Sequence, residues 1–292
     1  MTPSLTGGDL GQTMRAYPAV FRRPRRQRLL QALIWGGFGC FTVYCLAALG
    51  FFNFDMIGAG VKKLYAVVAF MLPPAARGRL PAFTLAIFET LGMAFLGTLL
   101  AAILALPLGF LGSKNIAGNA VFHFGLRRVF DFIRGIDALI WALVWINVVG
   151  LGPFAGILAI ACSVSGELAK LFSEAVENVD HRQIEGVRAA GANAVQLVRY
   201  AVLPQVFPVI LSNTLYYFES NTRSATILGI VGAGGIGLQL ADRIRVLAWD
   251  QASLIIIMIL VTVYLIDSVS NYLRRHFITA SIPNNLGKLS NN

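Results

Sequence analysis

The chain has 292 residues, of which 57% are hydrophobic and only 13% charged, and its mean hydropathy is +0.69. This composition is typical of a membrane protein and excludes an ordinary water-soluble fold. The formal net charge of +10 does not indicate nucleic-acid binding, because no soluble segment gathers the basic residues with aromatic side chains on one face.

The apolar runs predict an all-α membrane protein with about six transmembrane helices, since about 20 apolar residues cross the hydrocarbon core. Residues 1–28 form a basic tail. The next run, 29–52, is too long for the apolar region of a signal peptide and lacks a clear cleavage site, so we expect a retained first span. An external, partly interfacial segment follows over 53–81. The core, 82–275, holds five more predicted spans, at 83–110, 133–149, 154–172, 204–231 and 251–273, and a polar tail occupies 276–292.

The positions of lysine and arginine predict how the chain crosses the membrane. With six spans and both termini on one side, 15 of these residues lie on that side and six on the other. Cytoplasmic loops carry the excess of basic residues. We therefore expect both termini, residues 113–128 and the loop 178–204 to face the cytoplasm.

The loop 178–204 is a polar stretch between apolar runs. Asp180, three residues before Gln183, predicts a short helix that starts near His181. Gly191 can adopt the left-handed conformation that ends a helix, and a second short helix is expected over 193–200. Pro204 suits the first turn of the next span.

The same stretch resembles the cytoplasmic EAA loop of ABC-importer permeases. Glu185, Val187, Gly191, Leu203 and Pro204 are in register with that pattern, whereas Gly186 and Ala201 replace its usual Ala and Ile. In that family the first short helix inserts into a groove on an ATPase subunit. The resemblance therefore implies an ATPase-coupling loop that includes Glu185, Gly186, Val187, Arg188, Gly191, Leu203 and Pro204.

Several charged residues lie within the predicted spans, where an unpaired charge is costly. Glu219 and Arg223 are four residues apart, in the order that favours pairing on one helix. Glu167, Lys170 and Glu174 are separated by three and four residues. We expect these charges to pair with one another or with neighbouring helices. Glu89 and Asp267 lack a local partner and should face the interior of the bundle. Residues assigned to the translocation path or to intramembrane polar positions are Glu167, Lys170, Glu219, Asn221 and Arg223.

A glycine-rich segment, Gly232-Ala-Gly234-Gly235-Ile-Gly237, fits the spacing G-x-G-x-x-G of dinucleotide-binding proteins. That motif requires an acidic residue about 20 positions later, in a soluble strand-turn-helix unit. Ile257 stands at that position, inside an apolar span. We therefore predict an outer glycine turn in place of a nucleotide site.

Together with the preceding Glu219-x-Asn221-x-Arg223, this turn resembles the phosphonate-type permeases of ABC importers. Methionine permeases share the glycine turn, so the Glu-x-Asn-x-Arg part carries the distinction. The resemblance covers about residues 80–275. It implies a type I ABC importer permease fold, a homodimeric pore in a bacterial inner membrane, an ATPase dimer on the cytoplasmic side, and a periplasmic or lipid-anchored solute-binding protein.

The chain has no P-loop sequence, so ATP and Mg are expected on the partner ATPase and no cofactor on this chain. Its three cysteines, Cys40, Cys45 and Cys162, lie in apolar runs, and the histidines lack metal-binding spacing.

The sequence thus predicts a permease subunit, not an enzyme, for import of phosphonates or related phosphorus oxyanions. Phosphite, phosphate or methionine are alternative solutes. A secondary transporter or a membrane enzyme is the alternative class, although neither inverted repeats nor a convergent catalytic cluster is evident.

Overall fold

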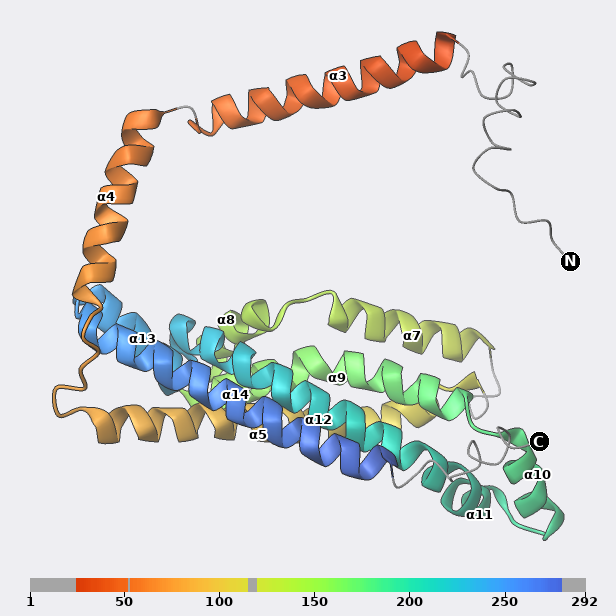
Figure 1. Cartoon of the computed structure of the whole chain (residues 1–292). Coiled ribbons are helices and arrows are strands. Elements are labelled where there is room, and N and C mark those ends of the chain that lie inside the picture. Colours follow the sequence, from red (N-terminus) through yellow and green to blue (C-terminus); the bar gives the residue numbers. More distant parts are fainter. Residues whose placement is uncertain (1–24, 52, 115–119, 280–292) are drawn as a thin grey trace, which may run out of the picture. The chain divides into compact units, whose positions relative to one another are not determined.

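The computed structural model describes residues 25–51, 53–114 and 120–279, and all regular elements in these ranges are helices (Figure 1). This confirms the all-α prediction. The predicted tails lie outside the described residues, apart from 25–28 and 276–279. The α-helices are α3 (Arg25–Ala48), α4 (Phe54–Phe70), α5 (Leu80–Leu111), α7 (Ala120–Arg134), α8 (Ala138–Val149), α9 (Pro153–Glu177), α10 (His181–Ala189), α11 (Ala194–Leu197), α12 (Leu203–Leu228), α13 (Gly235–Arg245) and α14 (Trp249–Thr279).

Within the described residues, five helices are long and apolar enough to cross a membrane, or six if the bent pair formed by α7 and α8 counts as one span. This agrees with the predicted number. The helices α5, α9, α12 and α14 coincide with the predicted second, fourth, fifth and sixth spans, with ends that differ by a few residues.

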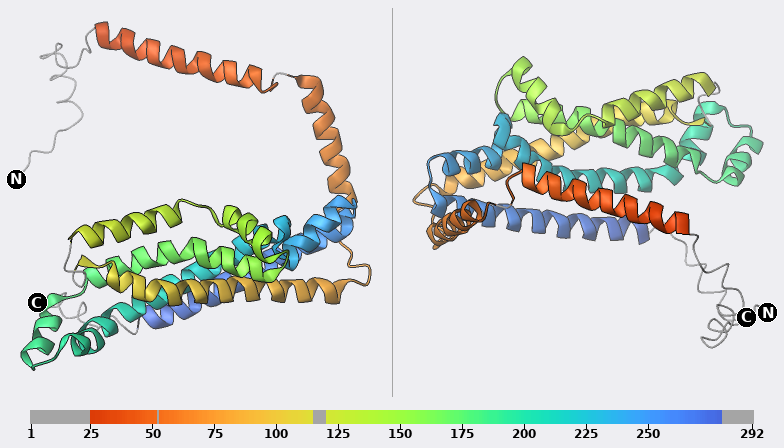
Figure 2. Two further views of the ribbon diagram at one scale, coloured as in Figure 1. Left: turned by 180° about the vertical axis from the view of Figure 1, so that it is seen from behind. Right: turned by 90° about the horizontal axis from the view of Figure 1, so that it is seen from above.

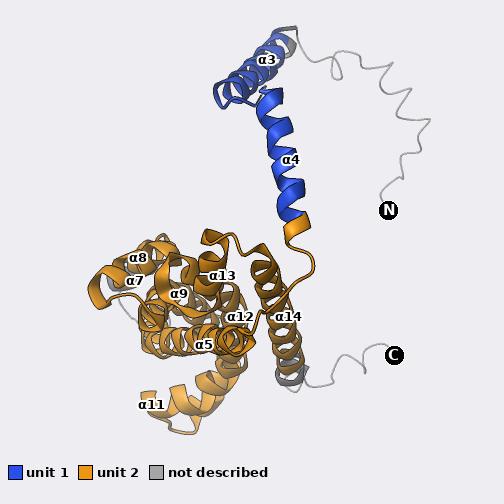
Figure 3. Cartoon of the chain, turned by 90° about the vertical axis from the view of Figure 1, so that its left-hand side faces the viewer, with its two compact units in different colours: residues 1–68 blue, residues 69–292 orange. Residues whose placement is uncertain are grey.

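The chain divides into two compact units, residues 1–68 and 69–292 (Figure 3). In the first unit, α3 contains the apolar stretch Leu29–Ala48, which is long enough to cross a membrane. It ends before the predicted limit of 52, and Gly50 follows it with a φ of +70°. The predicted interfacial segment contains α4, of 17 residues. The second unit contains the remaining helices.

Helix α9 is the centre of the second unit, and α5, α7, α8 and α12 all contact it (Figure 2). Its approach to α5 is very close. A Cβ atom added to Gly97 would lie 2.8 Å from the Ile160 side chain, and one added to Gly109 would lie 2.7 Å from Cβ of Phe172. Small residues allow this contact between membrane helices, where packing and not water drives association.

A buried polar contact joins α12 to α5. The Asn221 side-chain amide donates a hydrogen bond of 2.8 Å to Oγ1 of Thr98. Both residues are buried, and Thr98 also donates to the Ala94 carbonyl. The Asn221 amide nitrogen and the Thr98 hydroxyl therefore each have a hydrogen-bond partner, as is usual for buried polar groups.

The predicted third span, 133–149, is not one helix. Helices α7 and α8 are bent by 81° at a short break. Gly135 and Ile136 lie in this break, and the Asp137 side chain caps α8 by accepting a hydrogen bond of 2.8 Å from the Leu139 backbone N–H. A glycine followed by a capping aspartate ends one helix and starts another.

Two further segments expected as loops are helical. Helix α7 begins at Ala120, in the region predicted as a polar loop, and its Phe130 is buried against the core cluster. Helix α13 occupies much of the predicted loop 232–250. Figure 1 places α10 and α11 at one end of the second unit and α13 at the opposite end.

The α5–α9 contact predicts that Gly97→Val will lower the free energy of unfolding, because the added side chain must displace Ile160 or the Ile157 carbonyl. We expect a loss of about 1–3 kcal/mol. Gly92→Val on the same helix is the control, since a Cβ at Gly92 meets no atom within 4 Å. Thermal unfolding of the purified protein in detergent measures both, and equal stability of the two variants would contradict the predicted close packing.

Candidate functional site

The loop 178–204 folds as two short helices separated by a turn. Asp180 starts α10, because its side chain accepts a hydrogen bond of 2.9 Å from the Arg182 backbone N–H. The side-chain cap is thus made to Arg182 and not to Gln183, the residue on which the prediction was based. Gly191 has a φ of +83°, as predicted for the residue that ends this helix. Asn193 and Gln196 then form a complete capping box at the start of α11.

The second short helix differs from the prediction, because α11 ends at Leu197 and a π-helical turn, Val198–Val202, runs directly into α12. In this turn the Leu203 backbone N–H bonds the Val198 carbonyl, five residues back. Pro204 lacks an N–H, so the regular helical hydrogen bond to the Tyr200 carbonyl cannot form. The proline therefore accounts for a local π-helical geometry at the start of α12.

The predicted coupling residues of α10 are accessible in this chain. Glu185, Gly186 and Arg188 are exposed, and Val187 is half-buried. Ile184 and Arg188 of α10 also line a pocket that is formed with α9, α11 and the π-helical turn. Its lining residues include Val176, Val179, Ile184, Leu197 and Val202. Ile184 thus packs against the core cluster, while Glu185 and Gly186 lie on the exposed surface of the short helix.

The glycine-rich segment is a tight bend between α12 and α13. Gly232, Gly234 and Gly235 have φ values of +112°, +86° and +68°, which strain any residue with a Cβ. At Gly237 a Cβ would lie 1.9 Å from the Thr226 carbonyl oxygen, so close approach explains this glycine. The bend therefore has structural causes for each glycine of the motif.

Side chains of α5 satisfy the first backbone groups of α13. The Ile236 N–H donates a hydrogen bond of 2.9 Å to Oγ1 of Thr90, and the Gly235 N–H donates one of 3.3 Å to Glu89. Glu89 is exposed on the surface of the unit, so the prediction that it faces the interior is wrong. A carboxylate is favourable here because the N-terminus of a helix carries partial positive charge.

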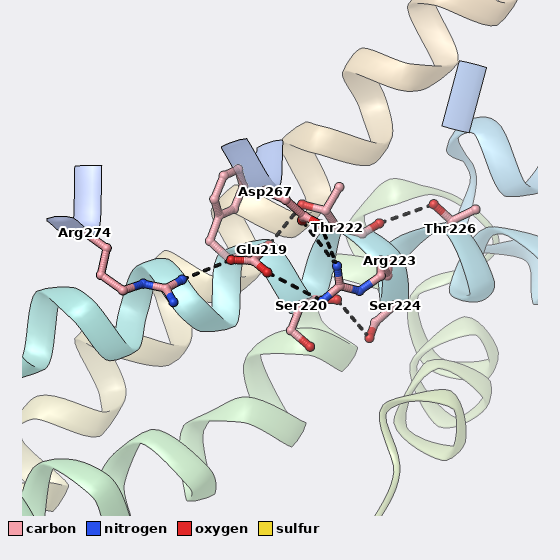
Figure 4. A network of polar contacts seen from close by, with 9 residues as sticks. Glu219, Ser220, Thr222, Arg223, Ser224, Thr226, Asp267 and Arg274 are labelled. Atoms are coloured by element: carbon pink, nitrogen blue, oxygen red, sulfur yellow. Dashed lines mark hydrogen bonds and ion pairs between the residues drawn. The ribbon is translucent and has the colours of Figure 1, made fainter. Parts of the chain in front are cut away.

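The predicted pair of Glu219 and Arg223 belongs to a larger network between α12 and α14 (Figure 4). Their closest atoms are 3.8 Å apart. Arg223 lies nearer to Asp267, at 3.2 Å, and Glu219 lies nearer to Arg274, at 3.0 Å. The nearest partners therefore come from the neighbouring helix, because α14 packs beside α12 and presents both residues to it.

Lys170 also pairs across helices. Its Nζ atom lies 2.9 Å from Asp131 on α7, so of the two predicted arrangements Lys170 adopts the pairing with a neighbouring helix. The hydroxyl of Tyr217 hydrogen-bonds Glu167. Lys170, Glu167 and Tyr217 line a cavity of about 400 Å³, together with Arg134, Leu171 and Glu174.

A second cavity, of about 410 Å³, shares Leu171 and Glu174 with the first and extends toward the loop 178–204. Its polar lining residues include Asn178, Gln205 and Asn213. Together these cavities form a polar groove between α9 and α12, which we call the α9–α12 groove. The predicted path residues Glu167 and Lys170 line this groove, whereas the buried Asn221 contacts Thr98 and is absent from its lining.

Four residues of these sites were not singled out from the sequence: Asp131, Arg134, Tyr217 and Arg274. The first two lie on α7, which was expected to be mostly loop. The spacing of Arg128, Asp131 and Arg134 by three residues is a helical signal that could have identified them. Among the described residues, no group of three or more His, Cys, Asp or Glu side chains could hold a metal ion, and the three cysteines are free.

Known proteins are similar to this chain in sequence. Residues 105–279 match the family model of the binding-protein-dependent transport system inner membrane component. A putative phosphite transport system permease protein, HtxC of Stutzerimonas stutzeri, is 36% identical over 222 residues, which are 76% of this chain and 78% of the relative. A putative cryptic phosphonate transport system permease protein, PhnE2 of Escherichia coli K12, is 50% identical over 121 residues, 41% of this chain and 99% of the relative.

The fold has a counterpart among solved structures. A chain of the MetNI methionine ABC transporter, in an inward-facing conformation, superposes with a TM-score of 0.60 at 21% identity, over 70% of this chain and 99% of that chain. This similarity confirms the predicted permease fold. With the family match over more than half of its length, the chain belongs to the binding-protein-dependent transport system inner membrane components and is a multi-pass permease subunit of an ABC importer.

Proposed function

We propose that this chain forms the translocation path of an ATP-driven importer for phosphonates or related phosphorus oxyanions. The observation that carries the proposal is the exposed surface of α10, which includes Glu185 and is followed by the turn at Gly191. The relatives of this chain are permeases named for phosphite and phosphonate. A partner ATPase binds ATP and Mg, because this chain has no P-loop. A soluble or lipid-anchored binding protein delivers the solute.

The active permease is a homodimer in this proposal. The α9–α12 groove is open along one side of a single chain and carries Glu167, Lys170 and Glu174. Charges exposed to hydrocarbon are costly, so they face another protein surface or a water-filled cavity. A second copy placed against this side closes the groove into a path between two identical chains.

Deleting the gene from its host tests the solute. We expect the deletion to abolish uptake of labelled phosphonate or phosphite, and the intact gene to restore it. Affinity purification of the tagged chain should recover an ATPase and a second, differently tagged copy of the chain. Unchanged phosphorus oxyanion uptake together with lost methionine uptake would contradict the proposed solute and support a methionine importer.

The proposed orientation places α10 in the cytoplasm and the end of α13 outside. In a cysteine-free background, we expect a membrane-impermeant maleimide to label Val246→Cys in intact cells and to label Arg188→Cys only after permeabilisation. Both positions are exposed, so a difference in labelling reports the side of the membrane. Labelling of Arg188→Cys in intact cells would overturn this topology.

Coupling to the ATPase predicts a contrast between two glycines of the loop. Gly191→Ala forces a side chain into a φ of +83°, which costs about 1–2 kcal/mol, and should lower binding-protein-stimulated ATP hydrolysis several-fold. Gly186→Ala is the matched control, because it introduces the residue that is usual at this position of the EAA pattern. Neither glycine has a neighbour within 4 Å of an added Cβ, and Gly186 has no positive φ.

The measurement uses the reconstituted complex in liposomes, with the amount of ATPase bound to each permease variant determined in parallel. Equal stimulation of the two variants would argue against a coupling role for the turn at Gly191.

A further inference from the structure

The break between α7 and α8 lies beside the middle of α9, because Arg134 at the end of α7 lines one cavity with Glu167 and Lys170. Helix α8 has 12 residues and extends about 18 Å, too short to cross the roughly 30 Å hydrocarbon core. Its far end joins α9 through a turn in which the Gly152 N–H bonds the Gly232 carbonyl, beside the glycine-rich bend. The break at 135–137 is therefore about 20 Å along α8 from that turn.

Non-helical backbone at this depth is tolerated where it borders a cavity. Here it does, because Arg134, the last residue of α7, lines the first cavity of the α9–α12 groove. Glu167 and Lys170, which line the same cavity, lie about 20–26 Å along α9 from Pro153, within a helix long enough to cross a membrane. Broken membrane helices mark solute sites in other transporters.

Arg134 differs from the other cations around it. On α7, α9, α12 and α14, the other basic side chains that the structure describes lie 2.9–3.4 Å from a carboxylate oxygen; these residues are Arg127, Arg128, Lys170, Arg223 and Arg274. Arg134 has no carboxylate within 4.0 Å among the described residues and is exposed to the cavity it lines. Its guanidinium is thus available to a solute.

We infer that Arg134 is the residue of the translocation path that binds the oxyanion. This inference rests on the proposed function. A guanidinium presents paired N–H donors that match a phosphonate or phosphite group. Glu167 and Glu174 line the same cavity and offset the positive charge of Arg134. This balance suits a path, because a contact must be favourable enough for entry and weak enough for release.

The test compares Arg134→Gln with Arg128→Gln, a matched change on the same helix at a residue that is absent from the lining of both groove cavities. In proteoliposomes with the ATPase and the binding protein, we expect Arg134→Gln to lower phosphonate or phosphite uptake about tenfold or more, the size of a lost charge-assisted hydrogen bond. Stimulated ATP hydrolysis should remain, so fewer solutes cross per ATP. Arg134→Lys should recover part of the uptake.

A second readout does not depend on transport. In a cysteine-free background, Leu171→Cys places a thiol in both cavities of the groove. Millimolar phosphite or methylphosphonate should slow its labelling by a water-soluble thiol reagent, and should have no such effect when Arg134→Gln is added.

The outcomes separate the two hypotheses. No oxyanion uptake by the unsubstituted complex would reject the proposed function, while the labelling experiment would still decide whether the groove binds an oxyanion through Arg134. Normal uptake by Arg134→Gln in an active system, or protection of Leu171→Cys that persists without Arg134, would overturn the inference. Equal losses of uptake, stability and ATP hydrolysis would assign Arg134 a structural role and overturn it as well.

Discussion

The close approach of α5 to α9 is the contact on which the other helices depend. Lipid tails are as apolar as leucine, so helices in a membrane gain stability from tight packing between small residues. Gly97 and Gly109 provide this along α5, where an added Cβ would meet Ile160 or Phe172. While one side of α9 packs against α5, other sides contact α7, α8 and α12, and the α9–α12 groove runs along part of its surface.

Ion pairs then connect the outer helices to this centre. Lys170 joins α9 to α7 through Asp131, and the network around Glu219 and Arg223 joins α12 to α14. Arg223 lies within reach of carboxylates on two helices, at 3.2 Å and 3.8 Å. Partly exposed pairs of this kind contribute modestly to stability, about 0–1 kcal/mol where water reaches them. Their main effect is to neutralise charge that would otherwise be costly beside lipid.

The helices were predictable from the sequence because length and apolar composition alone determine which segments can cross a membrane. Local signals also identified the turn at Gly191 and the bend at Gly232, where the backbone requires glycine. Ion pairs between helices were not predictable in the same way, because spacing ranks only partners on one helix. The nearest partners of Lys170 and Glu219 are therefore Asp131 and Arg274, on neighbouring helices.

The broken span was missed for a different reason. Hydropathy averages over about 20 residues, and the segments on both sides of Gly135 are apolar enough for that average to pass over the break. The stronger signal was local, a glycine two residues before Asp137, which caps α8. Because one continuous helix was expected over 133–149, Arg134 was expected at the edge of a span and not in the lining of a cavity.

The α9–α12 groove and the proposed coupling helix share a residue contact. Gln205 lines the end of the groove, and its side-chain oxygen accepts a hydrogen bond of 2.9 Å from the Asp180 backbone N–H. Asp180 in turn caps α10, while the Gln205 amide donates to the Ala201 carbonyl in the π-helical turn. A partner that displaces α10 must therefore move the start of α12 with it or break this bond. Either result changes the groove at the end nearest the partner, which gives the two sites a contiguous physical connection.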